Sequence, residues 1–119
     1  MIAETLTRAE QIARLNDRAR SGFDPSARIT FTRGCLAAFC SGDTPSGLLA
    51  QAELIKAIRR HRFDEDTYGE RDFGSLTFRD EQIFFKIDYY DLDLEFGSED
   101  PADASITCRV VTIMLASEY

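Results

Sequence analysis

The sequence predicts an α+β domain with a mainly antiparallel four-stranded sheet and two helices packed on one face. Three observations support this fold class. Residues 6–20 and 44–62 repeat apolar side chains at the period of an amphipathic helix. Two runs rich in aromatic and β-branched residues are joined by a short polar link, which is typical of a β-hairpin. With further strands at residues 29–33 and 106–116, the element order is α-β-α-β-β-β.

The length of 119 residues suffices for one hydrophobic core, and no linker divides the chain, so we expect a single domain over residues 1–119. No apolar run reaches the length of a membrane span, and the first residues lack the apolar core of a signal peptide. A cytoplasmic location is therefore expected. Cys35, Cys40 and Cys108 lack the spacing of a zinc site, so reduced and mostly buried thiols are expected.

The first helix is predicted to end near Arg20, before Ser21-Gly22. Thr7 and Glu10 have the spacing of a capping box. Small and aliphatic residues cover about half of the helical surface. The arginines of this helix form either a solvated face or a basic stripe, and we favour the solvated face; they are Arg8, Arg14, Arg18 and Arg20.

The middle of the chain is predicted to hold a strand and a second helix. In the strand at 29–33, Ile29 and Phe31 point inward, whereas the apolar segment 35–40 fits no element and stays unassigned. Thr44 suits the N-cap of the helix and Pro45 its first position. The predicted buried stripe, flanked by Leu54, consists of Leu48, Ala52, Ile55 and Ile58. The basic cluster that follows is explained by the negative end of the helix dipole.

The hairpin is predicted to join residues 72–78 to residues 83–90. In the second strand, one face carries Ile83, Phe85, Ile87 and Tyr89, and the other carries Phe84, Lys86, Asp88 and Tyr90. After Tyr90 the apolar phase changes, so a continuous strand needs a β-bulge near Tyr90-Asp91. With this bulge one polar face would hold Lys86, Asp88, Asp91, Asp93 and Glu95. The alternative is a strand end at Tyr90 and a short helical turn from Leu92 to Phe96; we prefer the bulge.

The charge is unevenly distributed along the chain. Residues 64–103 hold 14 acidic and 3 basic side chains, a net charge of −11, whereas residues 1–63 have a net charge of +4. Such a field repels nucleic acid and favours cations or basic protein surfaces. Acidic loops that merely keep the protein soluble are the simpler alternative.

Several residues are candidates for chemistry. The candidate metal ligands are Asp88, Asp91, Asp93 and Glu95, because calcium and magnesium prefer carboxylate oxygens. The EF-hand pattern fails, since Phe96 stands where that motif needs glycine. A metal-dependent hydrolase would also use Lys86. We assign no catalytic residue and expect no cofactor, although a divalent cation is possible. His61, the single histidine, is interpreted as a capping residue at a helix end.

Two further groups stand near the hairpin. Glu70, Arg71 and Asp72 lie at the entry to the hairpin, where they form either a local ion pair or a site. Tyr90 lies between Asp88 and Asp91 in sequence, so we expect it to be partly exposed. A partly exposed tyrosine is a candidate aromatic anchor at an interface.

Four stretches resemble a family of small bacterial proteins that is catalogued as a domain of unknown function, number 3768. They are residues 69–74, 84–91, 101–103 and 112–119. The similarity spans the C-terminal half and, more loosely, Leu15-Asn16-Asp17 in the first helix. Members of the family are often found on plasmids and other mobile elements. The family pattern has histidine at the position of Arg71 and tryptophan at that of Phe85. If that histidine were catalytic in the family, this chain would lack the catalytic residue. The resemblance implies no activity.

We therefore expect a small interaction or regulatory protein rather than an enzyme. It would present Asp88, Tyr90, Asp91, Asp93 and Glu95 to the basic surface of a partner protein. As an accessory factor of a mobile element it would act as an inhibitor or a DNA mimic, without binding nucleic acid or a membrane itself. The alternatives are a metal-dependent hydrolase that uses the carboxylates and a component of a toxin–antitoxin pair. The oligomeric state is not indicated by the sequence.

Overall fold

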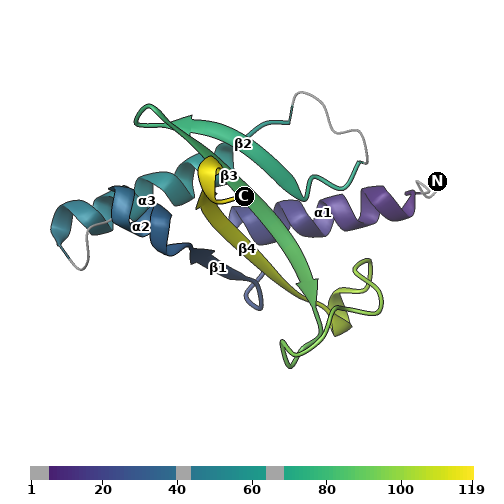
Figure 1. The fold of residues 1–119 in the computed structure, drawn as a ribbon. Helices are drawn as coiled ribbons and strands as arrows, with labels where there is room; N and C mark the ends of the chain where they lie inside the picture. The colour runs from purple at the N-terminus through teal and green to yellow at the C-terminus, as the bar shows by residue number, and fades with distance from the viewer. Residues whose placement is uncertain (1–5, 40–43, 64–68) are drawn as a thin grey trace.

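Within residues 6–39, 44–63 and 69–119, which the computed structural model describes, four strands form one sheet in the order β1-β4-β3-β2. Figure 1 views this sheet with the helices behind it. None of the helices in these ranges is long and apolar enough to cross a membrane. The elements are α1 (Arg8–Ser21), β1 (Arg28–Phe31), α2 (Arg33–Phe39), α3 (Pro45–Arg60), β2 (Phe73–Phe78), β3 (Glu81–Tyr90) and β4 (Cys108–Leu115), with short 3₁₀ turns at Ala104–Ile106 and Ala116–Glu118.

The α+β class is confirmed, but the sheet is mixed rather than mainly antiparallel, and the described residues form three α-helices rather than two. β1 runs parallel to β4, with Ile29 opposite Val111 and Phe31 opposite Ile113. A parallel pair needs a long crossover, and here the crossover contains α2, α3 and the hairpin. The direction of β1 is thus set by distant packing, which its own short sequence does not encode.

The predicted N-cap at Thr7 and the end of α1 at Ser21-Gly22 are confirmed, although only one of the two hydrogen bonds of a capping box is found among the described residues. The Thr7 hydroxyl accepts a hydrogen bond from the Glu10 amide at 3.1 Å, and Gly22 ends the helix in the left-handed conformation. The apolar stripe is buried as predicted. The expectation of a solvated arginine face is wrong for Arg20, because its side chain is buried in the described structure. Asn16, within the buried stripe, is fully buried as well.

The unassigned apolar segment forms α2, a short helix that depends on residues far away in sequence. Glu118 accepts hydrogen bonds from the Thr32 hydroxyl at 2.6 Å and from the Leu115 amide at 2.8 Å. Its carboxylate lies so close to Gly34 that a Cβ atom there would overlap it. Cys35 of α2 is fully buried, and no disulfide is found at it in the described structure. Cys108 is also buried and outside any disulfide there, whereas Cys40 lies outside the described residues.

The N-terminal cap of α3 is confirmed, whereas the predicted buried stripe is confirmed only at Ile58 and at the flanking Leu54. The Thr44 hydroxyl accepts a hydrogen bond from the Gly47 amide at 3.1 Å. Leu48 is 52% exposed, whereas Leu54 is fully buried between the helix and the sheet. The buried residues are Gly47, Ala50, Leu54 and Ile58. Because Gly47 and Ala50 are small, this side of α3 can lie close to its neighbours. Close packing therefore buries this side of the helix rather than the side that carries Leu48.

The hairpin is confirmed, with a tighter link than predicted. Arg79 and Asp80 form a two-residue turn and both have positive φ, which matches the twist of the strands. On the helix-covered face Phe85 is fully buried, and the Gly74 opposite it leaves room for the ring. On the other face Phe84 contacts the rings of Phe73 and Tyr119. The two predicted faces of β3 are therefore confirmed.

The preferred bulge near Tyr90-Asp91 is wrong, because β3 ends at Tyr90 and the chain turns back. The Asp91 amide donates to the Phe96 carbonyl at 2.8 Å, and Tyr90 pairs with Gly97. Leu94 has a φ of 59° within this turn, and no helical turn forms there. The phase change in the sequence marked the point where the chain leaves the sheet. The predicted single polar face of β3 and the following carboxylates does not exist.

Candidate functional site

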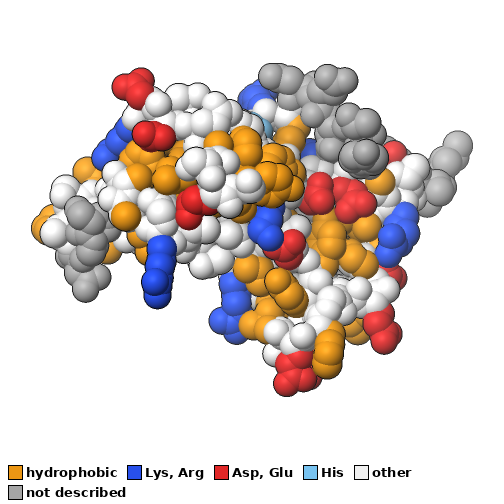
Figure 2. Space-filling view, in the orientation of Figure 1, with side chains coloured by type: hydrophobic (Ala, Val, Ile, Leu, Met, Phe, Trp, Pro, Cys, Tyr) orange, Lys and Arg blue, Asp and Glu red, His pale blue; other side chains and the backbone are white. Residues whose placement is uncertain are grey.

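Residues 91–106, which connect β3 to the last strand, carry six acidic side chains and no basic one. We call this segment the acidic lobe. In Figure 2 acidic and hydrophobic side chains lie next to one another over the lower part of the molecule, where Figure 1 places these loops. The lobe therefore combines a negative field with apolar surface.

Backbone and side-chain hydrogen bonds fix the shape of the acidic lobe. The Asp91 carboxylate accepts from the Glu95 amide at 3.0 Å, and the Ser98 amide donates to the Tyr89 carbonyl at 3.0 Å. In the second half of the lobe, the Thr107 hydroxyl donates to the Asp100 carbonyl at 3.0 Å. These contacts hold both turns against the end of the sheet, so the lobe is a built structure rather than a loose loop.

Apolar side chains of the lobe are exposed to solvent. Leu92 is 61% exposed and Phe96 is 71% exposed, and Leu94 and Ile106 are also exposed. A cluster of exposed apolar residues rimmed by polar ones is typical of an interaction surface. Solubility alone does not explain these residues, because exposing them is unfavourable.

A pocket of about 320 Å³ lies between the two turns of the lobe. Its lining residues are Asp91, Phe96, Gly97, Glu99 and Ile106. Two acidic residues and two apolar residues thus line one small volume.

The carboxylates of the lobe differ in their pairing. Asp100 forms an ion pair with Arg8 at 2.9 Å, and this contact lowers the pKa of Asp100. The side chains of Asp93 and Glu99 have no hydrogen bond or ion pair with any residue in the described part of the chain. Their charge is therefore directed at solvent or at an external partner.

The predicted partner-binding residues are divided between two surfaces. Asp91, Asp93 and Glu95 belong to the lobe, while Asp88 and Tyr90 lie on the open face of β3. Asp88 forms an ion pair with Lys86 at 2.8 Å, which raises the pKa of Lys86 and partly neutralises both charges. Within residues 6–39, 44–63 and 69–119, no three metal-ligating side chains come close enough to hold an ion. The four proposed ligands do not converge.

A buried polar network supports the acidic lobe from behind. The Asn16 amide nitrogen donates to the Glu70 carbonyl at 2.9 Å and to the Tyr89 hydroxyl at 2.8 Å. The Tyr89 hydroxyl in turn donates to the Glu70 carboxylate at 3.0 Å. Burial raises the pKa of Tyr89, and its bond to Glu70 adds to this rise. The network joins α1, the segment before β2 and the end of β3.

Arg109 connects this network to the lobe. It is 1% exposed, its Nε donates to the side-chain amide oxygen of Asn16 at 2.7 Å, and its guanidinium donates to the backbone carbonyl of Pro101. The same guanidinium lies 5.0 Å from the centre of the Tyr89 ring. Burial lowers the pKa of Arg109, but an arginine remains charged at neutral pH. The position of Pro101 is therefore tied to the core.

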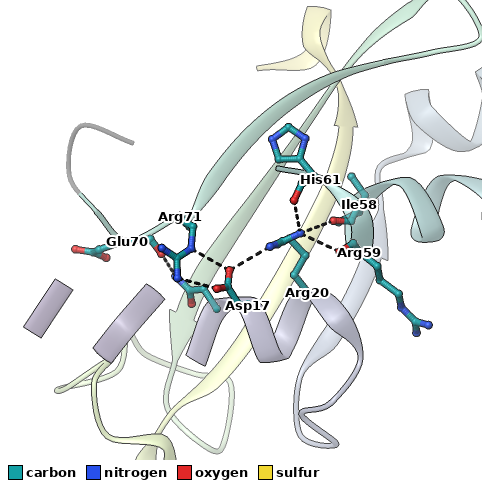
Figure 3. Close-up of polar contacts among 8 residues, drawn as sticks. Asp17, Arg20, Ile58, Arg59, His61, Glu70 and Arg71 are labelled. Carbon is teal, nitrogen blue, oxygen red and sulfur yellow. Dashed lines mark hydrogen bonds and ion pairs between the residues drawn. The ribbon is translucent and has the colours of Figure 1, made fainter. Parts of the chain in front are cut away.

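A second polar cluster surrounds Asp17 (Figure 3). Arg71 binds the Asp17 carboxylate through two nitrogens, at 3.0 Å and 2.7 Å, and its backbone has a φ of 54°. Arg20 contacts Asp17 from the other side at 3.1 Å and donates to the carbonyls of Ile58 and His61. Of the candidate residues at the entry to the hairpin, Glu70 belongs to the polar network around Asn16, and Arg71 belongs to the cluster around Asp17. The Asp72 carbonyl accepts from the Ile87 amide at 2.8 Å.

His61 ends α3 as its C-terminal cap, as expected. Its ring packs edge-on against Phe63 and Phe85, with centroid distances of 4.7 Å and 5.3 Å. The aromatic surroundings place His61 at the rim of the hydrophobic core.

We expect the Asp17→Asn protein to lose about 1 kcal/mol of unfolding free energy at neutral pH, because solvent screens this half-exposed group. Burial opposes the ionisation of Asp17, but the hydrogen bonds from Arg71 and Arg20 outweigh it and lower its pKa. The carboxylate therefore contributes stability that is complete above the usual pKa of 3.8 and is lost as the pH falls through the lower pKa of the folded state.

Urea unfolding between pH 7 and pH 2 checks this expectation. The difference in unfolding free energy between the wild type and Asp17→Asn should disappear at the acidic end. Glu81→Gln, at an exposed position, is the control and should show no such pH dependence. A difference that stays constant over the whole range would contradict the role of the Asp17 charge.

Sequence reasoning missed Asn16, Arg109 and Phe96. Arg109 carried a signal, because it shares the inward side of β4 with Val111 and Ile113 by the two-residue period. Asn16 falls four residues after Ile12 on the buried stripe of α1, which is unusual for a polar residue. Phe96 carried no local signal of exposure, since its position depends on the turn at Leu94.

A search of the curated proteins and a search of the solved structures found no match to the chain. A family with the description "Protein of unknown function (DUF3768)" matches residues 37–118, which is more than half of the chain. The matched region contains β2, β3, the acidic lobe, β4 and Arg109. It is the same family that the resemblance in the C-terminal half indicated. The chain belongs to this family of proteins of unknown function.

Proposed function

We propose that the protein is an interaction module whose acidic lobe binds a basic and partly apolar surface of a partner protein. The observation that carries the proposal is the exposure of Leu92 and Phe96 in a lobe where the side chains of Asp93 and Glu99 have no partner among the described residues. Apolar contacts supply affinity in such interfaces, whereas charge supplies the rate of encounter and the choice of partner.

The network behind the lobe supports this proposal. Arg109 holds the Pro101 carbonyl, and Arg8 holds the Asp100 carboxylate. A surface that is already ordered loses less conformational entropy on binding than a loose loop does. The proposed interface therefore needs little rearrangement.

A protein partner fits the lobe better than a role limited to imitating the phosphates of DNA. A DNA backbone offers charge but no counterpart to Leu92, Phe96 and Ile106, which lie among the carboxylates. A partner with aliphatic or aromatic side chains beside its basic residues would bury them. We propose this type of surface as the target.

The test measures fluorescence anisotropy with a labelled nine-residue peptide of alternating arginine and leucine. We expect saturable binding that weakens by roughly tenfold or more between 50 and 300 mM salt, because exposed charges are screened at high ionic strength. A peptide with glutamine in place of arginine should not bind. Binding of both peptides with equal affinity, or binding that is insensitive to salt, would argue against the proposal.

Two charge-matched variants locate the binding surface. Asp93→Asn/Glu95→Gln removes two lobe charges, and Asp80→Asn/Glu81→Gln removes two exposed charges at the opposite end of β3. We expect the first variant to bind the arginine–leucine peptide several-fold more weakly, and the second to resemble the wild type apart from a small effect of net charge. Equal weakening in both would mean that only the total charge matters.

A further inference from the structure

We propose that the pocket in the acidic lobe receives a single arginine side chain of the partner protein. This inference rests on the proposed function and adds to it the identity of the anchoring residue. The guanidinium would lie between the carboxylates of Asp91 and Glu99, against the ring of Phe96. Its aliphatic stem would run along Ile106.

The volume of the pocket suits one long side chain. About 320 Å³ is at the lower end of the range for small-molecule sites and is too small for a folded element. The lining combines two acidic residues with apolar walls, and the lobe itself supplies no cation. The complementary group must therefore come from outside the lobe and must carry both a positive charge and apolar surface.

The two walls are held in place independently. On one side, the bonds from the Asp91 amide to the Phe96 carbonyl and from the Glu95 amide to the Asp91 carboxylate close the first turn. On the other side, the Ile106 amide donates to the Asp103 carbonyl at 3.3 Å, and the hydroxyls of Ser98 and Thr107 lie 2.6 Å apart. The pocket is consequently formed before any ligand arrives.

Arginine fits this lining better than lysine does. A guanidinium is planar, so it stacks on an aromatic ring while its edge binds carboxylates. An ammonium group is compact and strongly hydrated, and it gains less from the exposed ring of Phe96. A metal ion is less suitable, because no group of three ligating side chains converges within the described residues.

The test is an NMR titration of the isotope-labelled protein with Nα-acetyl-arginine methylamide. Parallel titrations use the corresponding lysine derivative and the citrulline derivative, which has nearly the shape of arginine but no charge. We expect saturable shifts at the amides of Asp91, Gly97, Glu99 and Ile106. The arginine compound should bind at least about threefold more tightly than the lysine compound, and the citrulline compound should not bind.

Matched variants test each wall of the pocket. Glu99→Gln and Phe96→Ala should each weaken binding of the arginine compound by about tenfold, because each removes one of the contacts that distinguish arginine. Their controls are Glu81→Gln and Phe23→Ala; Phe23 is 74% exposed, compared with 71% for Phe96, and lies outside the lobe. The controls should bind like the wild type.

The outcomes separate this inference from the proposed function. Shifts outside the lobe, equal binding of lysine and arginine, or wild-type affinity in both pocket variants would overturn the arginine pocket. If the arginine–leucine peptide still binds in those variants and loses affinity in Asp93→Asn/Glu95→Gln, the proposed function stands and only the pocket is wrong. If the peptide does not bind the wild type at all, the proposed function has failed first.

Discussion

Replacement of Arg109 by methionine is expected to lower the free energy of unfolding by about 3 kcal/mol, because it breaks a buried, fully paired polar network. Methionine fills much of the same volume but cannot donate to the Asn16 side chain or to the Pro101 carbonyl. The Asn16 oxygen would then be buried without a partner, which is costly in itself. Chemical denaturation of the two proteins measures the difference.

The exposed Arg33→Met is the matched control and should change the unfolding free energy by less than about 0.5 kcal/mol. Hydrogen exchange provides a second measurement that a general loss of stability would not mimic. In Arg109→Met, the amides of residues 100–106 should exchange faster than expected from the global change. If they keep their protection relative to the rest of the chain, Arg109 does not hold the lobe.

Replacement of Phe85 by alanine is expected to lower the unfolding free energy by about 4 kcal/mol, within the range for large-to-small changes at a buried aromatic residue. Phe85 is fully buried and belongs to the core cluster with Leu54, Ile58 and Ile113. It also supports the rings of His61 and Phe63. A cavity at this position would loosen the contact between α3 and the sheet.

The neighbouring Phe84→Ala is the control, since Phe84 lies on the open face of the same strand and is only half-buried. Its replacement should cost about 1 kcal/mol, corresponding to the smaller apolar area that it removes from water. Urea unfolding of both variants tests the assignment of the two faces. Equal losses would mean that the face without helices contributes as much stability as the helix-covered one.

Local sequence signals predicted the parts of the fold that depend on near neighbours. Thr7, Gly22 and Thr44 mark helix ends because their contacts reach only a few residues along the chain. The hairpin followed from the two-residue period and from a turn that joins adjacent strands. These elements did not require knowledge of distant packing.

The predictions from sequence failed where contacts between residues far apart in the chain determine the structure. The direction of β1 depends on β4, about eighty residues later, as the pairing of Arg28 with Val110 shows. The burial of Arg20 depends on the carbonyls of Ile58 and His61, which no local pattern reveals. In α3 the choice between two apolar phases depends on the sheet surface that Leu54 meets.

The candidate site was predicted only in part. The excess of acid after β3 is visible in the sequence, and Asp91, Asp93 and Glu95 belong to the lobe, but their role in binding stays a prediction. The expected convergence of Asp88 with Asp91 on one polar face failed, since β3 ends at Tyr90 and Asp91 belongs to the turn that follows the strand. The pocket depended on Ile106 and Glu99, which become neighbours of Phe96 only after both turns have formed.

The central position of β4 also determines when the protein can fold during its synthesis. β4 pairs with both β1 and β3, yet it leaves the ribosome after the other three strands. Until then β1 has no partner strand, and one edge of β3 remains open. Asn16 also lacks its partner Arg109, which lies 93 positions later in the sequence. Such late, non-local pairing slows folding and exposes an unpaired strand edge. We therefore expect the nascent chain to hold little more than its helices and the β2–β3 hairpin until residues 108–115 emerge, a stage at which it would be a substrate for chaperones.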